Sequence, residues 1–249
     1  MSLERQEDHS NNPWWGEHIH RYQEAITLIK KDAKVLDIAC GSGFGSNLIA
    51  KQGHHVIGAD LSEEAVNDCN KKYSNTNLQF EVVDGTNMLY SNEVFDVVVS
   101  FETIEHSTEY QKMLHEFKRI VKKDGFVIIS TPNFLINSPN GVLINPFHTQ
   151  EWTYEQLKDL LNKTFSSVQL FGQSYTRYRN TKGISFILGK SVERILYCRG
   201  VRKLPITIQD KIMNLLIKQP MYPLPENYSL VSEESDIKLC KTFFAICKP

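Results

Sequence analysis

Two carboxylates and two imidazoles in this sequence are spaced so that they could meet at one point. Glu102, Glu105 and His106 directly follow Phe95–Phe101, an apolar run typical of a buried strand. If the chain turns helical there, positions three and four residues apart share one face, which would group these side chains. His148 lies in the loop after the next predicted strand. Because neighbouring parallel strands end at the same edge of a sheet, that loop should come near Glu102.

Three kinds of role fit these four residues, and the sequence leaves them open. Glu102, Glu105, His106 and His148 together form a mixed oxygen and nitrogen ligand set for a divalent ion. Without a metal, His106 could act as a general base, with Glu102 and His148 beside it in a catalytic group. In a scaffold role, His106 would cap a helix beginning at Ser107, and His148 would only hold its loop.

A glycine-rich turn lies upstream of this cluster. The stretch Val35–Gly45 is an apolar run, an acid and then glycines at 41, 43 and 45, which is typical of a strand, a tight turn and the start of a helix. Glycines let a ligand approach the backbone, and the helix N-terminus offers free N–H groups. The spacing is G-x-G-x-G, and Ser46 stands where the dinucleotide fingerprint G-x-G-x-x-G needs its third glycine.

The next two predicted strands also end in acids. His54–Asp60 ends in a carboxylate at the place where a doubly wound sheet binds a ribose diol. Leu78–Asp84 ends in a second carboxylate, followed by Gly85. Each acid alone could be a helix cap or a turn former, but their common order favours a ligand crevice at these strand ends.

These motifs resemble those of class I S-adenosylmethionine-dependent methyltransferases, over residues 15–175 and the last strand. The resemblance rests on Asp37–Gly45, Asp60, Asp84-Gly85 and Phe95–His106. It implies an α/β, Rossmann-like sheet of seven strands with the last antiparallel and helices on both faces. The residues expected to bind the cofactor are Arg21, Asp37, Ala39, Cys40, Gly41 and Gly43 toward the methionine end, Ser100 and Phe101 beside the sulfonium, Asp60 at the ribose, and Leu61, Asp84 and Gly85 at the adenine. For Arg21, solvation on a helix surface is the alternative.

The segment after the fourth predicted strand is similar to that of metal-dependent O-methyltransferases that act on the ribose 2′-hydroxyl of small RNA, and of ubiquinone-pathway O-methyltransferases. In the RNA enzymes an E-x-x-E-H segment and a later histidine bind magnesium. Carried over by position, the ligands are Glu102, Glu105, His106 and His148. Methyltransferases of sugars and natural products also carry the E-x-x-E-H segment, so it does not identify the acceptor.

Bulk properties narrow the function classes only slightly. The 249 residues carry a net charge of −1, so no excess of positive charge favours the binding of nucleic acid. Five scattered cysteines without a C-x-x-C pair favour a reducing, cytoplasmic compartment. Neither a signal peptide nor a membrane span is indicated. The sequence says nothing about the oligomeric state.

The predicted organisation is a loose N-terminus over 1–12, a core over 13–175, an inserted helical cap over 176–238 and a last core strand within 239–249. The insertion contains two amphipathic patterns, Ile184–Tyr197 and Ile208–Ile217, and would lie over the crevice to select the substrate. A plain stabilising helical pair is one alternative. Docking to a membrane surface is another, because five basic residues adjoin the apolar faces: Lys190, Arg194, Arg199, Arg202 and Lys203.

The leading functional hypothesis is methyl transfer from S-adenosylmethionine to a small-molecule hydroxyl, such as that of a glycosyl or secondary-metabolite acceptor, with or without a divalent metal such as Mg²⁺. Transfer to nitrogen or carbon is the first alternative. A nicotinamide-dependent oxidoreductase, or a cofactor-binding protein without turnover, is the second.

Overall fold

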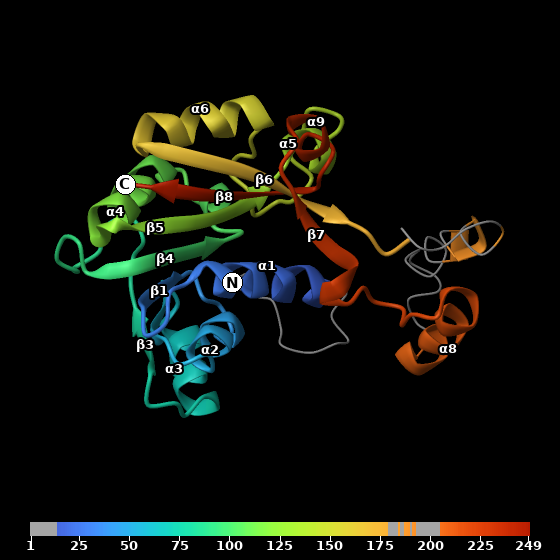
Figure 1. Cartoon of the computed structure of the whole chain (residues 1–249), viewed down its shortest axis with the longest axis horizontal. Helices are drawn as coiled ribbons and strands as arrows, with labels where there is room; N and C mark the ends of the chain where they lie inside the picture. The colour runs from blue at the N-terminus through green and yellow to red at the C-terminus, as the bar shows by residue number, and fades with distance from the viewer. Residues whose placement is uncertain (1–13, 179–183, 185–186, 190, 193–204) are drawn as a thin grey trace. The chain divides into compact units, whose positions relative to one another are not determined.

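The computed structural model describes residues 14–178, 184, 187–189, 191–192 and 205–249 (Figure 1). Within them an eight-stranded sheet has the order β3-β2-β1-β4-β5-β8-β6-β7. Its strands are β1 Lys34–Ile38, β2 His55–Asp60, β3 Leu78–Val82, β4 Phe95–Phe101, β5 Val121–Pro132, β6 Ser167–Tyr175, β7 Tyr228–Val231 and β8 Thr242–Lys248.

The strand directions confirm the predicted fold class. β1 to β5 pair in parallel, and β8 is inserted antiparallel between β5 and β6. The chain leaves β1 toward β2 on one side and returns as β4 on the other, and ligands bind at such a switch point. The short strand β7 was not predicted, because it follows the prolines at 220, 223 and 225, which indicated an extended loop.

Local sequence patterns predict two of the helix boundaries. Thr153-x-x-Gln156 has the form of a capping box, and the box is present: Thr153 and Gln156 exchange side-chain-to-backbone hydrogen bonds of 2.9 and 3.3 Å. The apolar period over 108–122 predicts a helix, and the helix found there is shorter, because Val121 already pairs with Phe95 in the sheet. The helices are α1 Trp15–Leu28, α2 Phe44–Ala50, α3 Glu63–Lys72, α4 Tyr110–Ile120, α5 Phe134–Asn137, α6 Tyr154–Thr164, α8 Ile206–Ile217 and α9 Glu234–Ile237, with 3₁₀ turns η1 Ile104–His106 and η2 Pro225–Asn227.

Helices cover both faces of the sheet, as predicted. On one face, α4 and α6 bury their apolar sides in a core cluster that includes Leu36 and Ile38 of β1. Side chains alternate along a strand, so Asp37 points to the other face. There it meets Tyr22 of α1 and Ser46 of α2. This alternation decides which residues of the glycine motif can reach the ligand crevice.

The chain divides into two compact units. The first contains Arg21–Ser174 and Leu230–Pro249; most of the second is Tyr175–Ser229, and it includes the start of α1 through His20. The second unit has a small core of its own around Tyr178, Met213, Ile217 and Met221.

Several predictions about the insertion fall partly or wholly outside the described residues. The pattern over Ile208–Ile217 corresponds to α8. Most of the pattern over Ile184–Tyr197 lies outside the described residues, and so do the five basic residues of the membrane-docking alternative. The predicted loose N-terminus over 1–12 also lies outside them. Among the described helices, none has the length and apolar character that crossing a membrane requires.

Candidate active site

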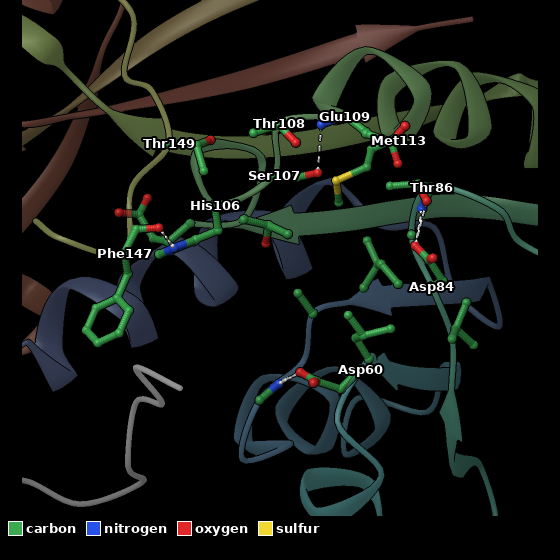
Figure 2. Close-up of a pocket in the computed structure, with 18 residues that line it drawn as sticks. Asp60, Asp84, Thr86, His106, Ser107, Thr108, Glu109, Met113, Phe147 and Thr149 are labelled. Atoms are coloured by element: carbon green, nitrogen blue, oxygen red, sulfur yellow. Dashed lines mark hydrogen bonds between the residues drawn. The ribbon is translucent and has the colours of Figure 1, made fainter. Parts of the chain in front are cut away.

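The strand ends of the first unit border an open cavity of about 580 Å³. Asp60 and Asp84 line one part of it, and His106 and Phe147 line another (Figure 2). The sequence-predicted residues on its surface are Ala39, Gly41, Asp60, Leu61, Asp84, Gly85, Glu102 and His106. The ends of β1 to β4 therefore contribute to a single crevice.

Asp60 ties the end of β2 to the glycine turn. Its Oδ2 accepts a hydrogen bond from the Gly41 N–H at 2.9 Å (Figure 2). Its Oδ1 accepts one from the Ser62 N–H at 2.9 Å. Each carboxylate oxygen has a second lone pair. The half-buried side chain can therefore hold the turn in place and still accept from a diol in the cavity.

Gly43 must be glycine for two reasons. Its φ of +72° lies in the left-handed region. A β-carbon there would also lie 2.7 Å from Cys69 Sγ and 2.7 Å from the Phe80 ring. The turn thus packs against α3 and β3 with no room for a side chain, which leaves its other side to the cavity.

The end of β3 presents a fixed carboxylate at the far side of the cavity. Asp84 Oδ1 accepts from the Thr86 N–H at 2.8 Å and from Thr86 Oγ1 at 2.7 Å. These bonds lower the Asp84 pKa, so the group is ionised at neutral pH. Leu61, 70% exposed at the cavity rim, supplies an apolar surface for a flat ring.

Asp37 lies behind the glycine turn instead of on the cavity surface. Its carboxylate accepts from Ser46 Oγ at 2.6 Å and from the Tyr22 hydroxyl at 3.2 Å, and the side chain is buried. Burial raises its pKa to about 7. In this geometry Asp37 joins α1, β1 and α2, and a direct contact with the methionine end of a cofactor stays a prediction.

Five further residues predicted at the cofactor are absent from the cavity lining: Arg21, Cys40, Gly43, Ser100 and Phe101. For Arg21, the alternative of surface solvation is wrong, because the side chain is fully buried. Its Nη1 donates to Gln173 Oε1 at 2.7 Å. A role for Arg21 at the methionine carboxylate is still a prediction.

Asp37→Asn should flatten the pH dependence of stability. The raised folded pKa means that the folded state binds the proton more tightly, so ionisation of Asp37 costs stability increasingly as pH rises from about 4 to about 7. The full cost is roughly 4 kcal/mol at most. Asparagine does not ionise and can still accept from Tyr22 and Ser46. The free energy of unfolding, measured with urea at pH 4.5, 6 and 7.5, should fall less with rising pH in the variant than in wild type. The same pH dependence in both proteins would contradict this.

Two carboxylates follow β4. Glu102 has a φ of +49° and forms a loop position, so the predicted shared helical face is wrong. Its Oε1 accepts from Ser130 Oγ at 2.8 Å, which turns the side chain toward β5. Glu105 is fully buried in η1, and its Oε2 accepts from Thr131 Oγ1 at 2.9 Å. Burial, followed by the nearby charge of Glu102, raises the Glu105 pKa well above its usual range.

The two histidines meet beside Glu105. The ring centroids of His106 and His148 are 4.8 Å apart in an edge-to-face arrangement, and His106 Nε2 lies 4.0 Å from Glu105 Oε1. One ligand atom from each of these three residues lies within 4.8 Å of the others. Three of the four predicted ligands are thus together, whereas Glu102 stands outside this group.

The predicted capping role of His106 is wrong. The helix after η1 begins at Tyr110 with Glu109 as its N-cap. His106 Nδ1 instead lies 3.1 Å from the Phe147 carbonyl (Figure 2). A carbonyl only accepts, so Nδ1 carries a proton, and in the neutral ring Nε2 has the lone pair.

The loop that carries His148 is fastened to η1 by hydrogen bonds that no sequence pattern indicated. The Thr149 N–H and Thr149 Oγ1 donate to the Glu105 carbonyl at 2.8 and 3.0 Å. Gln150 Nε2 donates to the Ser107 carbonyl at 2.8 Å. These bonds explain how His148, 42 positions after His106, comes to face it.

Comparison with known proteins identifies the family. Residues 29–199 match a family described as a methyltransferase domain. The chain belongs to this family. That membership confirms the predicted family, the class I S-adenosylmethionine-dependent methyltransferases. The same membership argues against the nicotinamide-dependent oxidoreductase.

Two relatives and one solved structure illustrate the match. The chain is 34% identical over 154 residues to a protein of Mycobacterium tuberculosis named as a probable S-adenosylmethionine-dependent methyltransferase, covering 60% of this chain and 54% of that one. It is 29% identical over 102 residues to the ubiquinone biosynthesis O-methyltransferase of Rhizobium etli, covering 40% and 41%. The chain thus spans about half the length of such relatives. A methyltransferase structure from Archaeoglobus fulgidus has the same fold, with a TM-score of 0.59, 20% identity and 94% of each chain covered.

Proposed function

We propose that the protein transfers the methyl group of S-adenosylmethionine to a hydroxyl of a small-molecule acceptor, such as a glycosyl or secondary-metabolite hydroxyl. The observation that carries the proposal is the group of Glu105, His106 and His148, of which His106 lines the same crevice as Asp60 and Asp84. An aliphatic hydroxyl is a poor nucleophile at neutral pH and needs a base or a cation. An amine attacks in its neutral form and needs neither.

The crevice suits an adenosyl group. Asp60 would accept from the ribose hydroxyls, and Asp84 from the adenine amino group, while Leu61 covers a face of the ring. The backbone of Ala39 and Gly41 would take the methionine end. Gly41 supports this assignment, because it lines the cavity at a φ of +56° and a β-carbon there would meet no protein atom within 4 Å.

The protein's own part in the reaction is alignment and proton removal. The donor supplies a methyl group already activated on a sulfonium, so alignment of the acceptor and exclusion of water supply most of the catalysis. His106 Nε2 would take the hydroxyl proton, because Nδ1 donates to the Phe147 carbonyl. Phe147, 46% exposed and part of the cavity wall, would contact the apolar part of the acceptor.

A divalent ion such as Mg²⁺ fits the same residues. Glu105 Oε1 is buried without a hydrogen-bond partner among the described residues, a costly state that a bound cation would relieve. Glu105, His106 and His148 would hold the ion, and the ion would lower the pKa of the acceptor hydroxyl. Both the metal-dependent and the metal-free routes use the same nitrogen of His106.

A methyl-transfer assay over a panel of acceptors tests the proposal. Hydroxylated glycosides and phenols should give S-adenosylhomocysteine and an O-methylated product. If chelator abolishes turnover and Mg²⁺ or Mn²⁺ restores it, the metal route is correct. Chelator-insensitive turnover assigns His106 as a metal-free base. Transfer only to nitrogen or carbon acceptors would refute the hydroxyl assignment, and no transfer to any acceptor would favour binding without turnover.

The proposal also covers the cellular compartment and the role of the inserted segment. The four cysteines in the described part of the chain are free thiols, in keeping with a reducing, cytoplasmic compartment. The insertion over 176–238 is proposed as the cap that selects the acceptor. Removing α8 should then alter acceptor preference without abolishing the binding of S-adenosylhomocysteine.

A further inference from the structure

We infer that Glu151 is a positioning residue that fixes His148 in the tautomer with its lone pair on Nε2. The inference rests on the proposed function, because it assigns His148 Nε2 as the atom offered to the acceptor or to a cation. His148 Nδ1 lies 2.7 Å from Glu151 Oε1. The two side chains are 9% and 1% exposed, so water competes little for this contact.

A chain of hydrogen bonds fixes where the proton lies. The Phe147 N–H donates to Asn145 Oδ1 at 3.0 Å, which sets the orientation of the Asn145 amide. The Asn145 Nδ2 therefore faces His148 Nε2 at 2.9 Å, and as an NH₂ group it can only donate. Nε2 must then accept, so the proton of the neutral ring is on Nδ1 and is donated to Glu151.

Glu151 is itself held in place. Its Oε2 accepts from the buried Ser138 Oγ at 2.9 Å. The next residue, Trp152, forms a bridge with Asn133 at the end of β5, and α6 begins two residues later. A carboxylate fixed at both oxygens orients the imidazole ring as well as its tautomer.

Asn145 is the present hydrogen-bond partner of His148 Nε2. Its amide N–H occupies the position on His148 Nε2 that an acceptor hydroxyl or a cation would take. Binding would exchange one partner of Nε2 for another, with Nδ1–H still held by Glu151. His106 and His148 would thus both carry the lone pair on Nε2, His106 set by a backbone carbonyl and His148 by a carboxylate.

Nitrogen NMR of protein with ¹⁵N-labelled histidine tests the tautomer without any acceptor. The wild-type signal of His148, assigned with His148→Asn, should show a protonated Nδ1 and an unprotonated Nε2. Glu151→Gln should keep this pattern, because its amide oxygen still accepts from Nδ1. Glu151→Met, of similar size, should give mixed tautomers. An Nε2-protonated wild-type ring, or an unchanged pattern in Glu151→Met, would overturn the inference.

Turnover provides the second readout. Glu151→Met should lose about 10–100-fold in kcat, with the affinity for S-adenosylhomocysteine unchanged, and Glu151→Gln should recover most of the loss. The matched control is Glu155→Gln, an exposed glutamate in the first turn of α6. Equal turnover in Glu151→Met and wild type would overturn the inference. If the tautomers behave as expected but wild type methylates no hydroxyl, the proposed function fails and the positioning role of Glu151 stands.

If Glu151→Met does not fold, the wild-type spectrum still decides the tautomer. Ser138→Ala then replaces it as the perturbation, since it removes the donor to Glu151 Oε2 and leaves the carboxylate in place. In Ser138→Ala, the His148 signal should move toward that of mixed tautomers. An unchanged His148 signal together with full turnover would count against the inference.

Discussion

His106→Ala is expected to lower kcat for hydroxyl methylation by about 10²–10⁴-fold. In either route, the loss removes the nitrogen that takes the proton or holds the cation. The affinity for S-adenosylhomocysteine should stay the same, because His106 lies on the part of the cavity away from Asp60 and Asp84 (Figure 2). Single-turnover and steady-state assays with one hydroxyl acceptor measure the effect.

His115→Ala is the matched control for this variant. His115 is an exposed residue of α4 whose Nδ1 contacts the carbonyl of Gln111 in its own helix. Its loss should leave kcat unchanged. If His106→Ala and His115→Ala had the same kcat, the imidazole of His106 would have no part in the reaction. Alignment of the acceptor would then be the remaining source of catalysis.

Asp60→Ala should weaken the binding of S-adenosylhomocysteine by about 1–3 kcal/mol, or roughly 5–150-fold. Two losses combine in this estimate: the bonds to the ribose hydroxyls, and the bond that holds the Gly41 N–H in the glycine turn. Asp60→Asn should fall between the alanine variant and wild type, because one oxygen still accepts. Isothermal titration calorimetry gives the affinities.

Asp68→Ala provides the comparison for Asp60→Ala. Asp68 lies in α3, where its exposed carboxylate pairs with Lys71, and it is not part of the cavity lining. Its affinity should match that of wild type. If Asp60→Ala bound as tightly as Asp68→Ala with an unchanged melting temperature, Asp60 would have no place in the cofactor site.

The sheet and the crevice could be predicted because the signals were local and repeated. Apolar strands ending in Asp60 and Asp84, with the glycine turn at 41–45, appear at regular intervals along the chain. Parallel strands bring their carboxyl ends to one edge. From such a pattern, the position of a ligand crevice follows without knowledge of any long-range contact.

The details that were missed depend on side-chain alternation and on distant loops. Asp37 is in the glycine motif, yet its place in β1 turns it toward α1 and α2. Glu102 stands at a left-handed position that a helical interpretation of E-x-x-E-H could not indicate. For Glu151, the spacing H-x-x-E was visible, but its meaning required the burial of both side chains and the orientation of Asn145.

A crystal structure with S-adenosylhomocysteine tests the central claim most directly. The account predicts the adenosyl group in the cavity at the ends of β1 to β4, with its ribose hydroxyls on Asp60, its adenine beside Asp84 and its sulfur facing His106. A ligand bound elsewhere, or one whose ribose does not meet Asp60, would contradict the account.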